Sequence, residues 1–248
     1  MSFAISNELP AWRRYYRARP DEAFFAGFQQ ALQQAASGDV AAARAALGPV
    51  QALHDDSVGR PAEQQLRFAS LLNKAYQANG LQAAKAYLQN LPPADLAVLQ
   101  EAHSLAEPIN VASLSEEGAA NLLLPAGYGV DLDGDQFFDV GLARTGSFPP
   151  QDAPAGFVQA WEQATTGLDE GDLLQHVFTM QLSFSSINLE TGRTTLRADR
   201  PSSELASYRD SVGNILAMLE RDRHTLPAGQ YEREAPFYRR LQALLAAA

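Results

Sequence analysis

Four aspartates lie within nine residues of one another, at Asp131, Asp133, Asp135 and Asp139. Without a cation, the mutual repulsion of these carboxylates opposes a compact loop. Ca²⁺ takes about six to eight oxygen ligands, and a chain that curls around it supplies carboxylates at loop positions 1, 3, 5 and 9 and a main-chain carbonyl at position 7. The spacing therefore predicts a Ca²⁺ site formed by the four aspartates and the carbonyl of Phe137.

The run from Asp131 to Asp139 resembles the calcium loops shared by EF-hands, dockerins and integrin-type FG-GAP repeats, and this resemblance is confined to residues 131–142. Position 6, usually glycine, is Gln136, and position 12, where an EF-hand has a bidentate glutamate, is Leu142. The resemblance therefore implies an FG-GAP-like loop closed by Asp139. Because the loop has fewer strong ligands than an EF-hand, we expect an affinity of about 10⁻⁵ to 10⁻³ M. Further ligands would come from elsewhere, and nearness in sequence makes these residues candidates: Asn110, Glu116 and Glu117.

A metal-free interpretation of the same residues is a tight turn at Asp133-Gly134, with the other aspartates on a solvated face. That turn does not account for the two further carboxylates in the same phase, so we favour metal binding. The four histidines are widely separated, without the spacing of a zinc or di-iron site. No set of residues indicates catalysis, and a metal-dependent hydrolase would need an open coordination position beside a general base.

Composition narrows the class of protein. With 248 residues and 46% hydrophobic side chains, the chain can bury a substantial core, and the absence of cysteine excludes disulfides and thiolate sites. The net charge of −10 repels nucleic acid and anionic membranes, and we expect neither as a partner. No apolar run approaches the ~20 residues that span a bilayer, and the first residues lack the apolar stretch of a signal peptide. We therefore expect a cytoplasmic protein with a protein partner of unknown identity.

The elements that must position the loop are mostly helices. Apolar periodicity, caps and Gly or Pro punctuation predict helices over residues 21–38, 39–48, 61–79, 81–90 and about 93–108, and a capping box at Ser113–Glu116 predicts one more before Pro125. The segment from Gly38 to Leu47 is weakly repeated about 41 residues later, from Gly80 to Leu88. Such an echo is typical of two-helix repeats, and it supports an alternative function as a metal-free helical-repeat adaptor.

From Tyr128 the pattern changes to alternation, which predicts two extended arms joined across Asp133–Gln136. Residues 146–154 form a Pro-rich connector, followed by a helix with Phe157 and Trp161 on one face. Alternation over residues 178–184 predicts a strand, and Glu190–Gly192 is typical of a turn that leads into a partner strand at residues 194–196. A helix through residues 172–178 precedes this strand or is an alternative to its first part. Two further helices, over residues 203–223 and 231–247, end the chain.

Together these patterns predict a mainly α (α+β) protein, with a helical region at 1–110 and an Asp-loop region at 111–248, or a single domain combining both. The function that we expect is non-enzymatic: a soluble calcium-binding protein in which Ca²⁺ supports the local fold or an interaction surface.

Overall fold

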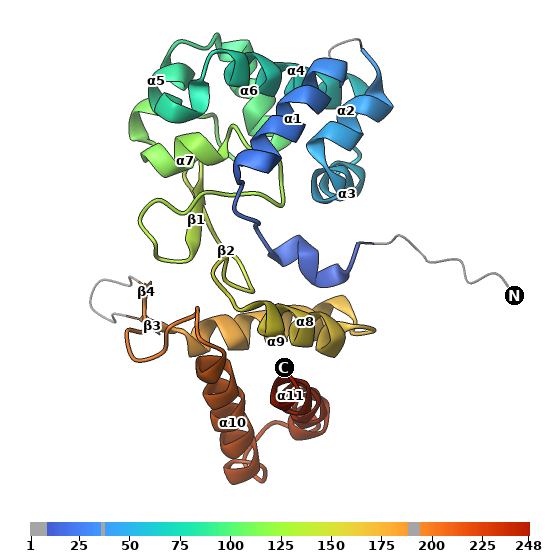
Figure 1. The fold of residues 1–248 in the computed structure, drawn as a ribbon, viewed down its shortest axis with the longest axis vertical. Helices are drawn as coiled ribbons and strands as arrows, with labels where there is room; N and C mark the ends of the chain where they lie inside the picture. Colours follow the sequence, from blue (N-terminus) through green and yellow to red (C-terminus); the bar gives the residue numbers. More distant parts are fainter. Residues whose placement is uncertain (1–8, 36–37, 188–193) are drawn as a thin grey trace, which may run out of the picture. The chain divides into compact units, whose positions relative to one another are not determined.

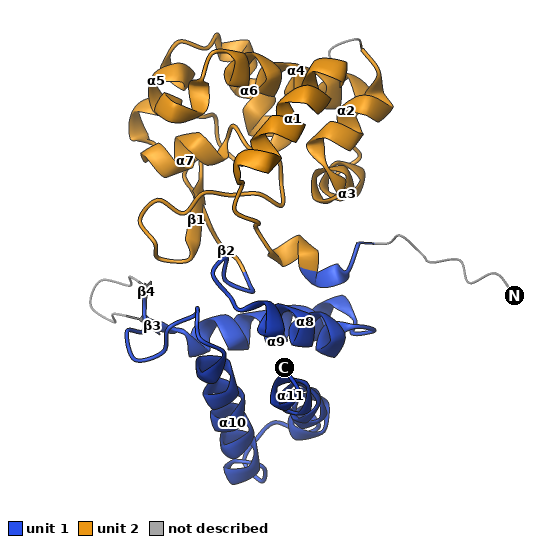
Figure 2. Cartoon of the chain, viewed as in Figure 1, with its two compact units in different colours: residues 1–12, 148–248 blue, residues 13–147 orange. Residues whose placement is uncertain are grey.

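The computed structural model describes residues 9–35, 38–187 and 194–248, and it is 61% helix and 6% strand. The predicted mainly α class is therefore confirmed. The chain divides into two compact units, unit 1 with residues 1–12 and 148–248 and unit 2 with residues 13–147 (Figure 2). The acidic loop belongs to the same unit as the N-terminal helices, whereas the sequence grouped it with residues 111–248.

Unit 2 is built mainly from short helices, which Figure 1 shows in blue to green. They are α1 (Glu22–Ala35), α2 (Val40–Leu47), α3 (Pro49–Ser57), α4 (Ala62–Gln77), α5 (Ala84–Gln89), α6 (Pro93–Ala102) and α7 (Glu116–Asn121). Asp39 caps α2 by accepting the N–H of Ala41 at 2.8 Å, and the predicted start of that helix is confirmed. These helices supply the scaffold on which the acidic loop is fixed.

Helix α3 was missed by the sequence prediction, which left residues 50–60 unassigned. Gly48, with φ of +88°, ends α2 and precedes α3, and Pro49 occupies the first turn of α3. The residues that α3 buries are Gln51 and Asp55, so its buried face shows no apolar periodicity from which the helix could be predicted. Asp55 instead forms a buried ion pair with Arg60, at 2.7 Å.

The core of unit 2 centres on α4, which packs against α1, α2 and α6 and whose Phe68 and Leu72 are fully buried. The same core includes Leu122 and Leu123, which follow α7, and Val140. Burial of this apolar surface stabilises the unit and anchors both sides of the acidic loop.

The acidic loop precedes a hairpin rather than forming its turn. Strands β1 (Phe137–Val140) and β2 (Ala143–Gly146) pair antiparallel, and their connection is Gly141-Leu142. The predicted pair of arms joined across Asp133–Gln136 is therefore wrong. The physical reason is that backbone N–H groups of residues 134–136 donate to the Asp131 carboxylate instead of to a facing strand.

The two segments of the weak internal echo also fold differently. Gly38 lies outside a helix with φ of +87°, whereas Gly80 opens the 3₁₀ helix η2 (Gly80–Ala83) before α5. The helical-repeat adaptor accordingly stays a prediction without structural support from this echo. Among the residues that the structure describes, no helix has the length and apolarity needed to cross a membrane.

Unit 1 is a helical unit with an aromatic core. Its elements are α8 (Ala155–Thr165), α9 (Glu170–Ser183), α10 (Leu205–Arg221) and α11 (Gln230–Ala246), with the antiparallel pair β3 (Ser185–Ile187) and β4 (Thr194–Leu196). Phe157 and Trp161 of α8 are fully buried, as predicted, and Phe157 stacks on Tyr208 with ring centroids 3.7 Å apart. The two predicted C-terminal helices are confirmed as α10 and α11.

The predicted strand over residues 178–184 is wrong, because this segment lies almost entirely in α9. Asp169 begins the helix by accepting the N–H of Asp172 at 2.8 Å. Met180 is buried while Phe178 and Leu182 are exposed, so the alternating apolar residues do not share one face. The alternation arises because α9 carries apolar side chains on two faces. The predicted turn at Glu190–Gly192 lies outside the described residues.

Candidate metal site

Helix α7 is the element that holds the acidic loop. Its N-cap is Ser115, whose Oγ accepts the N–H of Gly118 at 2.9 Å. The capping box predicted at Ser113–Glu116 is therefore misplaced by two residues, since Ser113 ends the 3₁₀ helix η3 (Val111–Ser113). The helix itself is short, Glu116–Asn121, and its position depends on the core beneath it.

Two side chains one turn apart on α7 hold both ends of the loop. The Oε2 of Glu117 accepts the N–H of Leu132 at 2.7 Å, and its Oε1 accepts the N–H of Asp139 at 2.8 Å. Asn121 accepts the N–H of Val130 at 2.8 Å and donates to the carbonyl of Asp139 at 2.8 Å. Because Glu117 and Asn121 are both buried, these bonds are shielded from water and fix the two loop ends beside each other.

A close backbone approach completes the attachment. The N–H of Gly141 donates to the carbonyl of Gly118 at 3.0 Å. A Cβ on Gly118 would lie 2.3 Å from the carbonyl oxygen of Gly141, so glycine at position 118 is what permits the hairpin to reach α7.

Within the loop, the Asp131 carboxylate gathers backbone donors. Its Oδ1 accepts the N–H of Gly134 at 2.7 Å, and its Oδ2 accepts that of Gln136 at 2.9 Å. Asp133 accepts the N–H of Asp135 at 3.2 Å. Gln136 has φ of +65°, the left-handed conformation that glycine adopts most easily and that costs other residues about 1–2 kcal/mol. The chain thus curls around the Asp131 carboxylate even though position 6 is not glycine.

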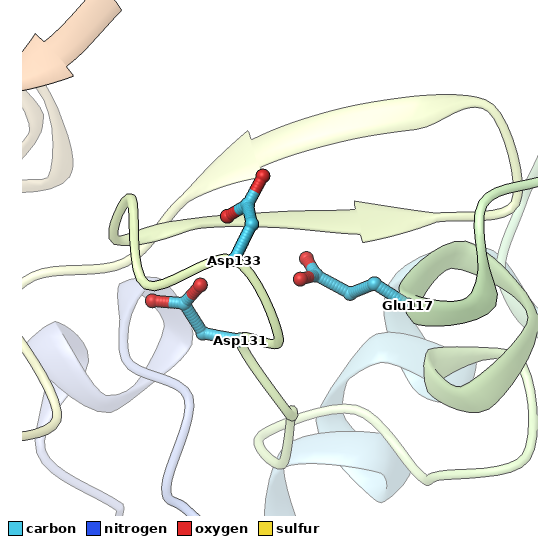
Figure 3. A group of neighbouring side chains, drawn as sticks. All are labelled: Glu117, Asp131 and Asp133. Atoms are coloured by element: carbon cyan, nitrogen blue, oxygen red, sulfur yellow. The ribbon is translucent and has the colours of Figure 1, made fainter.

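Three carboxylates converge on one point. Glu117, Asp131 and Asp133 each offer an oxygen, and these oxygens all lie within 4.8 Å of one another. Within the described ranges, these three residues form the group of acidic side chains that could hold a metal ion. Figure 3 shows Glu117 reaching from α7 toward the loop that carries the two aspartates. Glu117 is 6% exposed, Asp131 half-buried and Asp133 exposed, so the cluster opens to solvent on the side of Asp133.

The other predicted ligands lie at the edge of this group. Asp135 accepts the N–H of Phe137 at 2.8 Å and forms an ion pair with Arg144. Phe137 begins β1 opposite Gly146, and its ring lies 5.0 Å below the guanidinium carbon of Arg144. The Asp139 carboxylate accepts the hydroxyl of Ser115 at 2.8 Å. The structure therefore joins Asp131 and Asp133 with Glu117, and leaves Asp135 and Asp139 outside the group.

Of the additional ligands suggested by nearness in sequence, the structure brings only Glu117 into the group. Asn110 instead caps η3 by accepting the N–H of Ala112 at 3.2 Å. Asn121 was not proposed from the sequence. Its signal was weak, an asparagine one helical turn after Glu117, where its side chain can reach the backbone of the following loop.

The electrostatics of the site disfavour an isolated charge on the buried glutamate. Burial raises the pKa of Glu117 above its usual value, and the negative charges of Asp131 and Asp133 raise it further, while the two N–H donors from Leu132 and Asp139 oppose the shift. Burial likewise raises the pKa of Asp135, against the opposing effects of the Phe137 N–H and Arg144. A bound cation would remove the part of both shifts that comes from neighbouring carboxylates.

An open groove of about 490 Å³ lies elsewhere in unit 2, along one face of α4 and beside α6. Its lining includes apolar side chains such as Leu66, Leu71 and Val98 and charges of both signs, among them Arg67 and Asp95. Arg67 already pairs with Glu63. This mixed charge points to no class of ligand, so the acidic loop remains the candidate site.

Comparison with known proteins assigns no family to the chain: no family model, curated protein or solved structure matches it.

Proposed function

We propose that unit 2 binds one Ca²⁺ ion in the acidic loop, and that the ion supports the local fold or an interaction surface rather than catalysis. The observation that carries this proposal is the convergence of the Glu117, Asp131 and Asp133 oxygens within 4.8 Å, with Glu117 buried. Three carboxylates at this separation repel one another, and a hard divalent cation bound between them would outweigh that repulsion by attracting each carboxylate.

The position of Glu117 supports the proposal further. The loop resembles a calcium loop but has Leu142 at position 12, where an EF-hand supplies a bidentate glutamate. Glu117 brings a carboxylate to the loop from a different part of the chain, and it could take over that role. Each of its oxygens accepts one N–H, yet a carboxylate has about four lone-pair directions, so two remain for a metal.

The proposed ligands therefore differ from the set that the sequence predicts. We assign Glu117, Asp131 and Asp133 as the central carboxylates. The carbonyl of Phe137 and Asp135, whose carboxylate pairs with Arg144, are outer candidates for the shell. Asp139 stands at position 9, where the contact to Ca²⁺ often passes through water. Its bond to Ser115 is compatible with such an outer role. Mg²⁺ fits less well, because it favours one or two carboxylates and retains several waters.

The sharpest test is an NMR titration of the full chain after removal of divalent cations with a chelator. We expect saturable Ca²⁺-dependent shifts of the Leu132, Gly134 and Gln136 amides, with a Kd of about 10⁻⁵ to 10⁻³ M, and much weaker effects of Mg²⁺. The indole signals of Trp12 and Trp161, both in unit 1, should stay unchanged and provide an internal reference. Loop amides that do not shift in millimolar Ca²⁺ would overturn the proposal.

Asp133→Asn is the variant that best separates metal binding from folding. Asp133 is exposed, and its bond to the Asp135 N–H can be kept by an asparagine oxygen. We expect this variant to fold normally and to bind Ca²⁺ at least about tenfold more weakly, which corresponds to about 1.4 kcal/mol. Asp210→Asn makes the same change of charge at an exposed position in α10 and should bind like the wild type. Equal affinity of the two variants would argue against the assigned site.

The metal-free adaptor remains the alternative function. It predicts that Ca²⁺ leaves the loop amides unaltered in both the wild type and Asp133→Asn, and that Ca²⁺ stabilises neither protein. A metal-dependent hydrolase has less support, because it requires a general base and a substrate pocket beside the ion. The 490 Å³ groove is lined by α4, α6 and residues near the end of α1, and includes none of the loop carboxylates.

A further inference from the structure

We draw no further inference here: the strongest candidate, the exposed apolar row of Leu174, Phe178 and Leu182 along α9, is an unpartnered helix face, and nothing in the structure shows what covers it.

Discussion

Glu117→Gln should reveal how the buried glutamate is shared between the fold and the metal. A glutamine can accept only one of the two N–H groups that Glu117 now accepts, from Leu132 and Asp139, and its NH₂ faces the other. An unsatisfied buried donor costs about 1–3 kcal/mol. Removing the charge also relieves the repulsion of Glu117 by Asp131 and Asp133, which offsets part of this cost. Without Ca²⁺, we therefore expect a net loss of less than about 3 kcal/mol.

Ca²⁺ should widen that difference. An ion present at tenfold its Kd stabilises the wild type by RT ln 11, or about 1.4 kcal/mol, and a variant that has lost a central ligand gains almost none of this. The assay is urea unfolding followed by far-UV circular dichroism, in chelator and in Ca²⁺, for the wild type and Glu117→Gln. Asp133→Asn provides the comparison, because it should leave stability in chelator almost unchanged and still lose most of the Ca²⁺ increment.

The reasoning fails if the wild type and Glu117→Gln differ by the same free energy of unfolding with and without Ca²⁺. In that case Glu117 acts only as an acceptor for the two loop N–H groups. A loss above about 3 kcal/mol in chelator alone would refute a different step, since the cost of one unsatisfied donor could not account for it.

Three further outcomes follow from the same structure. Because the pKa of Glu117 is raised above its ordinary value of 4.5, protons should begin to compete with Ca²⁺ for this carboxylate at a pH above 4.5, and acidification should weaken Ca²⁺ binding. A Ca²⁺ Kd that stays constant down to pH 4.5 would contradict this. Burial lowers the pKa of His176, in α9, to about 4, so the free energy of unfolding of unit 1 should fall by roughly 2 kcal/mol between pH 7 and pH 5. Urea unfolding followed by tryptophan fluorescence measures this loss, and His176→Phe should abolish most of it. Gln136→Gly should relieve the left-handed strain and raise the free energy of unfolding by about 0.5 kcal/mol after the entropic cost of glycine, whereas Gln136→Ala should not.

The helices that could be predicted from the sequence are those whose buried face is apolar or whose start has a strong cap. Helix α8 buries Phe157 and Trp161 at helical spacing, and α2 follows the N-cap Asp39, so both helices could be predicted. Helix α3 buries polar residues and was missed. In α9, apolar residues such as Phe178 are exposed, and this produced a false alternation that favoured a strand. Both errors arise where the pattern of hydrophobicity does not follow the pattern of burial.

Some residues of the candidate site could be predicted from a short stretch of sequence, whereas others depend on how distant parts of the chain pack. Asp131 and Asp133 could be predicted because the spacing of loop ligands is a property of a short stretch of chain. Glu117 was one of three candidates that sequence distance could not separate, and only the packing of α7 selects it. The pairing of Asp135 with Arg144 required the hairpin register, which the sequence placed incorrectly.

The attachment of the loop to α7 also bears on the role that Ca²⁺ would have in the proposed site. Glu117 and Asn121 together hold both loop ends through hydrogen bonds that involve no cation. Asp131 closes the loop on itself in the same way. Because these bonds already fix the loop, an ion has little folding to drive, and its free energy of binding should appear mainly as added stability of unit 2. A sensor needs two states that differ in their affinity for the ion, and a loop held at both ends by buried side chains provides little room for a second one. We therefore expect Ca²⁺ to act as a structural ion in this protein, with shifts limited to the loop and α7.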